Sequence, residues 1–229
     1  MAVQHTLNTH KGENMSIYST LKDLQQAAAK ENTGGSGRSF LTLKSGESFK
    51  IRFRQELAED GKNFDEDLGT GLVVPVHVHP NDFKRKLACT LEDEAFDFKC
   101  WPHEQVVANP KWRDKKHFLV NVAVLDNNEW SNKILDQTFS PKHVINALIE
   151  YALEYGSTTD REYKITRTGS SMNDTQYMLI PGSESKVPDD VAKLEVADLS
   201  TVYRKLPYDE QAEYFLALKE DSQPASKGW

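Results

Sequence analysis

Apolar and polar positions alternate most regularly in the middle of the chain. In HFLVNVAVL, residues 117–125, every second side chain is apolar, which is typical of a β-strand that buries one face. The DNN sequence at 126–128 predicts a turn, and residues 131–139 predict a shorter strand that returns beside the first. This pair of strands is the strongest structural signal in the chain.

A second alternating pattern lies in FLTLKSGESFKIRFRQEL, residues 40–57, with a turn at SGE. After the turn, apolar residues alternate with cations. The apolar face would hold Phe49, Ile51 and Phe53, and the opposite face would hold Lys50, Arg52 and Arg54. We expect a strand whose outer face is a row of cations, a pattern that suits contact with phosphate but is also found on a merely solvated sheet face.

Helical periodicity follows the central strands. Ser140 is a favourable N-cap, Pro141 is a favourable first residue, and apolar positions recur at helical spacing up to Gly156. Residues 161–168 and 175–180 predict two further strands joined by a hairpin loop. The principal elements therefore run as three strands, a helix and two strands. This order predicts a mainly β chain with a five-stranded OB-fold barrel, whose helix lies between strands 3 and 4.

The predicted domain organisation has three parts. Residues 1–37 form an N-terminal arm with a short amphipathic helix at 16–30, which is followed by the flexible linker NTGGSG. Residues 38–183 form the OB-fold core, with an insertion at about 76–116. A short apolar strand, LVVPVHV at residues 72–78, leads into this insertion. Residues 184–229 form an acidic C-terminal region.

The charge of the chain is unevenly distributed. The 229 residues carry a net charge of −7, which argues against a uniformly basic surface. Residues 38–54 nevertheless hold five basic side chains and one acidic one, a local charge of +4, and residues 111–116 hold four and one, a local charge of +3. Residues 186–221 hold nine acids and five bases, a local charge of −4, and include a short helix predicted at 209–219. Basic segments within an acidic chain point to a localised anionic partner.

Composition narrows the cellular setting. No apolar run approaches the roughly 20 residues that cross a bilayer, and the N-terminal sequence MAVQHTLNTHKGEN lacks the apolar core of a secretion signal. Two cysteines are too few for a disulfide framework, and cysteines near histidines in an intracellular protein favour metal chemistry. We therefore expect a cytoplasmic protein that does not contact the membrane.

The two cysteines fall within one histidine-bearing segment. Their spacing is His77-x11-Cys89-x10-Cys100-x2-His103, and four nitrogen or sulfur donors from short loops are what a tetrahedral Zn²⁺ site requires. His79 is an alternative to His77, because the two side chains alternate to the same face of a strand. With all four positions filled by protein, the Zn²⁺ would be structural and would fold an otherwise polar insertion.

Sequence motifs of zinc and phosphate enzymes are absent. The chain has no His-x-Glu with Pro-Cys-x-x-Cys, no His-Glu-x-x-His, no Gly-x4-Gly-Lys-Ser/Thr loop and no Gly-x-Ser-x-Gly elbow. We therefore expect no catalytic activity.

Cations and aromatic residues are interleaved in and around the insertion, as in proteins that hold single strands with a cationic groove and aromatic platforms. The candidate cations are Lys50, Arg52, Arg54, Lys84, Arg85, Lys86, Lys111, Arg113, Lys115, Lys116, Lys164 and Arg167. The candidate platforms are Phe83, Trp101, Trp112, Tyr163 and Tyr177. Each aromatic residue could equally belong to the core or its rim.

Three segments together resemble the gene-32-type single-stranded DNA-binding proteins of tailed bacteriophages. They are MSIYSTLKDLQQ with the following linker and SFLTLKSGESFKIRF, the insertion with donors in the order His, Cys, Cys and a fourth ligand, and KKHFLVNVAVLD. The resemblance covers residues 15–182. The family's usual fourth ligand is Cys, where this chain has His103, and His77 matches the family's His better than His79.

The resemblance implies an OB-fold core with structural zinc that binds single-stranded DNA without regard to sequence, in phage DNA replication, recombination and repair in the host cytoplasm. It also implies self-association through the N-terminal helix and contacts of the acidic C-terminal region with replication or recombination proteins. Two alternatives stay open. One is a zinc-containing protein-interaction module of a replication complex, and the other is a metal-dependent nuclease.

Overall fold

The computed structural model describes residues 39–171 and 174–217, and these residues belong to one compact unit. The predicted N-terminal helix and its linker lie outside the described residues. Within the described part of the chain, no helix combines the length and the apolar character needed to cross a membrane.

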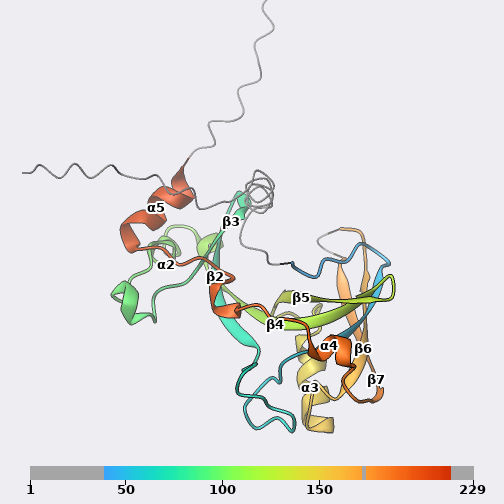
Figure 1. The fold of residues 1–229 in the computed structure, drawn as a ribbon. Helices are drawn as coiled ribbons and strands as arrows, with labels where there is room; N and C mark the ends of the chain where they lie inside the picture. The colour runs from blue at the N-terminus through green and yellow to red at the C-terminus, as the bar shows by residue number, and fades with distance from the viewer. Residues whose placement is uncertain (1–38, 172–173, 218–229) are drawn as a thin grey trace, which may run out of the picture. The chain divides into compact units, whose positions relative to one another are not determined.

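An antiparallel sheet of seven strands forms the centre of this unit (Figure 1). The strands are β1 (Ser48–Phe53), β2 (Leu72–His79), β3 (Asp82–Ala88), β4 (Lys115–Asp126), β5 (Glu129–Thr138), β6 (Arg161–Thr168) and β7 (Gln176–Glu184). Their order is β3-β2-β4-β1-β6-β7, and β5 pairs with β4. The predicted mainly β class is confirmed, and β3 is a strand that the sequence pattern did not predict.

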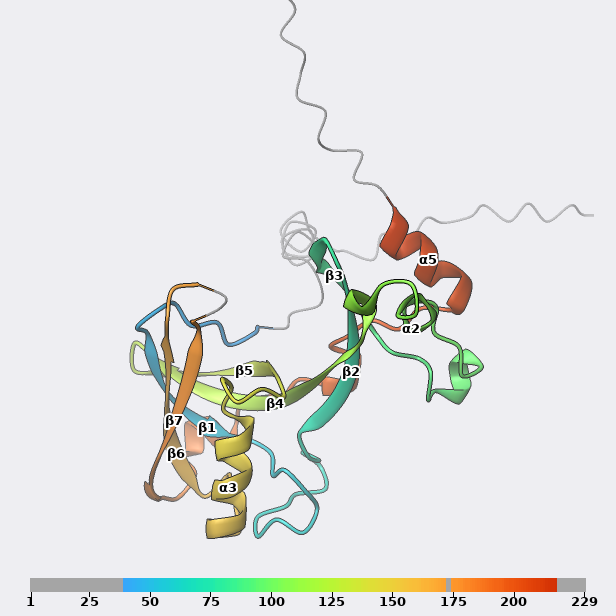
Figure 2. The same cartoon turned by 180° about the vertical axis from the view of Figure 1, so that it is seen from behind.

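The long strand β4 connects two parts of the sheet. Its first half pairs with β2, its second half pairs with β1, and β5 follows it along its whole length. The predicted turn at 126–128 is present, with Asn127 and Asn128 at positive φ, a conformation that Asn tolerates better than most residues. Because β4 is shared, the β2–β3 hairpin is a direct extension of the sheet that contains β1 and β5 (Figure 2).

The helices are short, apart from one. They are η1 (Glu94–Phe96), α2 (Trp101–Gln105), η2 (Pro110–Trp112), α3 (Ile145–Tyr155), α4 (Asp189–Ala192), η3 (Leu199–Thr201) and α5 (Tyr208–Leu216). The predicted start of α3 at Pro141 is wrong. Ser140 instead begins a turn, in which its carbonyl oxygen accepts from the amide of His143, and the helix begins at Ile145, four residues after Pro141. It ends where predicted, at Gly156 with φ of 76°.

Helix α3 buries one side against the main core. That core lies where β1, β4, β6 and α3 meet and includes Ile51, Val122, Leu148 and Tyr163. The apolar stripe predicted for the helix is wider than its buried face, since Leu153 is 82% exposed.

Two smaller cores lie on the β2–β3 extension. One joins Val76 and Leu119 of the sheet to Leu199 and Tyr203 of the C-terminal chain. The other joins Leu87, Trp112, Leu206 and Phe215. Both include residues that follow β7, so the extension depends on the end of the chain for its apolar packing.

The described residues of the predicted C-terminal region pack against the sheet and against α2. After β7 the chain crosses the sheet through α4 and η3 and reaches α5 beside α2 (Figure 1). Asn121, fully buried in β4, fixes this course, since its side-chain amide donates to the carbonyl oxygen of Ala197 at 2.9 Å and its oxygen accepts from the Ala197 amide at 2.9 Å. We call residues 185–217 the C-terminal strap.

Candidate metal centre and its cationic surroundings

Four nitrogen and sulfur donors meet beside the β2–β3 hairpin. His77 comes from β2, Cys89 follows directly after β3, and Cys100 precedes α2, which carries His103 in its first turn. Ligand atoms of His77, Cys89 and His103 all lie within 4.8 Å of one another. The Sγ atoms of Cys89 and Cys100 lie 3.6 Å apart. His77, Cys89 and His103 thus form a group that could hold a metal ion, and Cys100 lies beside that group.

The side chain of His77 is fully buried and has one free nitrogen. Its Nδ1 lies 2.6 Å from the carbonyl oxygen of Trp112, to which it donates. Its Nε2 is buried without a hydrogen-bond partner among the described residues. A buried acceptor without a partner is costly in a folded protein. A metal ion at Nε2 would satisfy this atom, with the Trp112 carbonyl fixing the tautomer.

His79 does not share the environment of His77. The pairing of β2 with β3 shifts between Val78 and His79, so the simple alternation that placed both histidines together does not hold. The ring of His79 lies 5.3 Å from that of Trp112 and stacks at 6.3 Å on Phe215. His77 is therefore the histidine of the donor group, and His79 packs in an aromatic cluster.

The two thiols share a hydrogen bond that Cys89 donates. This bond lowers the pKa of Cys100 against the opposing effect of burial, and backbone hydrogen bonds at Thr90 and His103 act in the same direction as the bond. The same bond and burial raise the pKa of Cys89. The lowered pKa favours the thiolate form of Cys100, which is the form that binds metal. Two sulfurs and two imidazoles fit a tetrahedral site, with Cys100 and His77 buried, Cys89 partly buried and His103 exposed.

The two cysteine-bearing loops are tied together by Gln211 of α5. Its side-chain amide donates to the hydroxyl of Thr90 at 3.0 Å, and its oxygen accepts from the amide of Trp101 at 2.9 Å. Thr90 follows Cys89 and Trp101 follows Cys100, so one side chain spans both donor loops. Gln211 is 2% exposed, and nothing in the sequence pattern distinguished it from other polar residues of the strap.

Several predicted DNA contacts remain on the surface of this extension. Lys84, Lys111, Arg113, Lys115 and Lys116 are exposed, and no ion pair involves them in the part of the chain that the structure describes. Phe83 is 64% exposed at the start of β3. These six residues, which we call the cationic surface, come from β3, η2 and the start of β4.

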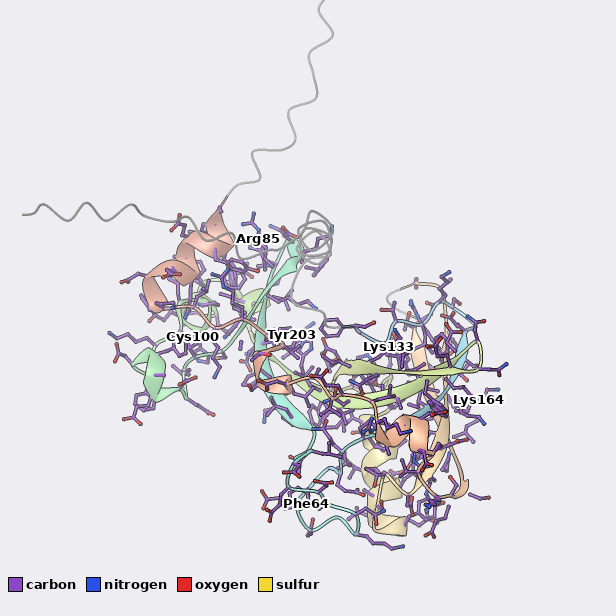
Figure 3. The ribbon with its side chains drawn as sticks, in the orientation of Figure 1. Phe64, Arg85, Cys100, Lys133, Lys164 and Tyr203 are labelled. Atoms are coloured by element: carbon purple, nitrogen blue, oxygen red, sulfur yellow. The ribbon has the colours of Figure 1, made fainter. Side chains whose placement is uncertain are left out.

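Arg85 and Lys86 are engaged with the C-terminal strap. The Arg85 guanidinium donates to the carbonyl oxygens of Tyr214 and Phe215 at 3.2 and 3.0 Å, at the end of α5 where helix carbonyls lack intrahelical partners. Figure 3 shows Arg85 beside α5 and the β3 strand. The Lys86 amine lies 6.0 Å from the ring centroid of Tyr203.

The predicted row of cations along β1 is wrong for two of its three members. Lys50 is exposed and pairs with Glu162 at 3.0 Å, and Lys164 beside it is exposed (Figure 3). Arg52 and Arg54 are 1% and 8% exposed because the C-terminal strap covers that face. Arg52 donates to the carbonyl oxygens of Thr159 and Ser185.

Three further candidates have structural contacts. Arg167 donates to the carbonyl oxygen of Leu43 at 2.7 Å. Tyr163 lies in the main core with its ring 5.1 Å from Phe53, and Tyr177 packs against the same core. Tyr163 is therefore a core residue and Tyr177 is partly buried, and alternation alone does not say which face of a strand is buried.

The two tryptophans of the insertion pack against each other. The ring centroids of Trp101 and Trp112 lie 5.4 Å apart, and Trp112 is 8% exposed while Trp101 is partly exposed. Trp112 is therefore a core residue, and Trp101 keeps part of its ring accessible beside His103.

A buried polar cluster was also missed by sequence reasoning. Nδ1 of His117 lies 2.7 Å from an oxygen of Asp136 and 2.9 Å from the hydroxyl of Tyr203, which donates to the other Asp136 oxygen. The cluster joins Tyr203 of the strap, labelled in Figure 3, to His117 of β4 and Asp136 of β5. Its members are spread over 87 positions, so no local sequence pattern predicts it.

Comparisons of this chain with protein-family models, with curated proteins and with solved structures find no match. The candidate metal centre and the surfaces around it are therefore interpreted from their own geometry.

Proposed function

We propose that this chain is a non-enzymatic single-stranded DNA-binding protein in which a structural Zn²⁺ shapes part of the binding surface. Thiolate and imidazole donors favour Zn²⁺ over the oxygen-seeking Mg²⁺ and Ca²⁺. With four protein donors, the ion would have no open position for a substrate or water. Its role would be to hold the loops that follow β3 against the hairpin.

The strand pairing supports an OB-fold barrel as the body of the protein. β1 pairs with β4 and β6, β4 pairs with β5, and β6 pairs with β7. The helix α3 lies between β5 and β6 in sequence, as it does between strands 3 and 4 of an OB fold. No pairing joins β5 to β7 among the described residues, which corresponds to a partly open barrel. On this reading β2, β3 and the metal loops are an insertion between the first two barrel strands.

The observation that carries the proposal is the cationic surface. Its five exposed cations have no ion-pair partners among the residues described, and they flank the metal loops on an extension of the sheet. A charged side chain that forms no internal pair is free to meet phosphate, and release of counterions from the strand would drive binding. Phe83 and the accessible part of Trp101 supply aromatic surface for bases, and stacking contributes roughly 1–3 kcal/mol per base.

Titration of a labelled oligothymidylate at two salt concentrations tests the proposal. We expect binding that weakens steeply with salt and depends little on base composition. Replacing Lys111, Arg113 and Lys116 with Ala should reduce the slope of log K against log salt by about 0.7 for each lost phosphate contact. Salt-independent binding, or no binding by the folded protein, would exclude it.

A charge-matched control separates a local surface from general electrostatics. Lys44, Lys193 and Arg204 are also exposed but lie outside the cationic surface. Replacing these three with Ala changes the net charge equally and should leave the salt slope close to that of the parent protein. Equal losses in the two triple variants would mean that only overall charge matters and would contradict the proposed surface.

A further inference from the structure

A cleft of about 830 Å³ lies where the C-terminal strap crosses the end of β1, away from the metal loops. Its walls come from β1, from the loop that carries Asn63 and Asp65, from the chain before β6, and from Glu184–Val187 and α4. The volume is within the usual range for small-molecule sites. Three cations line it, namely Arg52, Arg54 and Lys186.

Arg54 is the unusual member of this lining. Its side chain is more than nine-tenths buried, yet within residues 39–171 and 174–217 its guanidinium donates a single hydrogen bond, from Nη1 to the carbonyl oxygen of Leu194 at 3.2 Å. No carboxylate of the described residues pairs with it. Burial alone lowers its pKa, without an opposing nearby charge. A buried charge normally has a partner, and a guanidinium offers five donors.

Arg52, two residues earlier, provides an internal comparison. Its guanidinium donates to three oxygens of the strap and to the carbonyl oxygen of Thr159. Asp160 and Glu162 are close enough to offset part of the effect of burial on its pKa. Arg52 within β1 thus has its donors satisfied, whereas Arg54, directly after β1, has most of its donors unused.

The carboxylates around the cleft are largely committed elsewhere. Asp160 accepts two hydrogen bonds from Arg161, at 2.7 and 3.0 Å. Glu184 lies 3.6 Å from the amine of Lys62. Within the described chain, one carboxylate of the lining, Asp65, has no ion-pair partner. Two cations of the lining, Arg54 and the exposed Lys186, also have no ion-pair partner. The unpaired charge of the lining is therefore positive.

We infer that this cleft is a second anion site, which binds the phosphate group of a nucleotide through Arg54 and Lys186. A guanidinium matches two phosphate oxygens with parallel N–H donors, and the remaining volume accommodates a sugar and base. The phosphate could belong to a free nucleotide or to a nucleotide within a strand. The site stands apart from the cationic surface in its residues, and it does not depend on the metal.

Calorimetric titration with thymidine 5′-monophosphate, with thymidine as the uncharged control, tests this inference on the full chain. We expect the monophosphate to bind and thymidine not to bind. Arg54→Met should weaken binding about tenfold or more, since a hydrogen bond to a charged group is lost. Lys186→Glu, at an exposed position, should weaken it about fivefold without affecting folding.

Arg204→Glu is the matched control, because Arg204 is exposed on the same strap and lines a separate pocket with Arg85 and Tyr214. Its affinity should stay within about twofold of the parent, as for a distant screened charge. No binding of the monophosphate at millimolar concentration would overturn the inference. So would binding that Arg54→Met and Lys186→Glu both leave unchanged while circular dichroism shows them folded.

Competition identifies the source of the phosphate. If oligothymidylate displaces the monophosphate from the parent protein, the site belongs to the path of a strand. If both bind at once, it is a separate nucleotide site. The triple variant of the cationic surface should retain monophosphate binding, so the failure of one proposal is distinguishable from the failure of the other.

Discussion

Nδ1 of His77 donates to the carbonyl oxygen of Trp112 across 2.6 Å, and this single bond orients the other ring nitrogen toward the cysteines. Trp112 closes the 3₁₀ turn at Pro110–Trp112, immediately before β4. The imidazole is thereby held as the tautomer whose Nε2 carries a lone pair, which is the form that binds metal.

The first prediction separates His77 from His79. His77→Ala should abolish bound Zn²⁺ because it removes a buried donor, whereas His79→Ala should keep close to one ion per chain. Elemental analysis of the purified variants measures this. A stoichiometry near zero in the parent protein purified without chelator would refute the donor assignment altogether.

The second prediction concerns the extent of unfolding when the site is broken. Cys89→Ser should unfold the loops between β3 and β4, since four donors would no longer hold them. Helix α3 packs on the separate main core and should remain intact. Hydrogen exchange resolved by segment should show faster exchange at 89–112 and unchanged protection at 145–155. Loss of protection in both segments would contradict this separation.

The third prediction concerns Gln211. Gln211→Ala should lower the free energy of unfolding by about 1–3 kcal/mol, because it removes a partner from the fully buried Thr90 hydroxyl. Glu210→Ala is the matched control, since Glu210 is its exposed neighbour on the same helix. Urea unfolding measures both. An equal effect at the two positions would indicate a general contribution of helix α5 rather than the hydrogen bonds of Gln211.

The fourth prediction concerns pH. Burial alone would raise the pKa of Asp136, but the hydrogen bond and charge of His117, the hydroxyl of Tyr203 and the charge of Lys86 hold it below its usual value. A carboxyl group with a lower pKa in the folded state stabilises the fold above its unfolded pKa, near 3.9. This contribution is lost as pH falls through the folded value.

Asp136→Asn should therefore destabilise the protein at pH 6 and show a smaller difference from the parent near pH 3. Urea unfolding at both pH values measures this difference. Asp189→Asn, at an exposed position on α4, should show little difference at either pH. A destabilisation by Asp136→Asn that is the same at both pH values would show that the carboxylate charge is not responsible.

Local patterns were enough to predict the strands with strong alternation and the end of α3 at Gly156. They also grouped His77, Cys89, Cys100 and His103, because the chemistry of these residues is rare and their spacing is short. These features depend on neighbours within one segment, which a sequence displays directly.

Features that depend on distant segments were not predictable. Arg52 and Arg54 alternate correctly with Ile51 and Phe53, but residues more than 130 positions away cover them. Tyr163 and Lys164 adjoin in sequence and fall on opposite faces of β6, and alternation alone does not indicate which is inside. The β2–β3 bulge that separates His79 from His77 likewise leaves no mark in the sequence.

The bridging role of Gln211 has a consequence for the order of synthesis. A nascent chain that has reached α3 already contains all four metal donors, yet it lacks the side chain that ties Thr90 to Trp101. It also lacks Leu206 and Phe215, which complete the apolar packing around Trp112. The metal loops can therefore take their final form only after about 60 further residues, from Tyr155 to Phe215, have been made, so ribosome-bound intermediates would hold an ion less firmly than the finished protein.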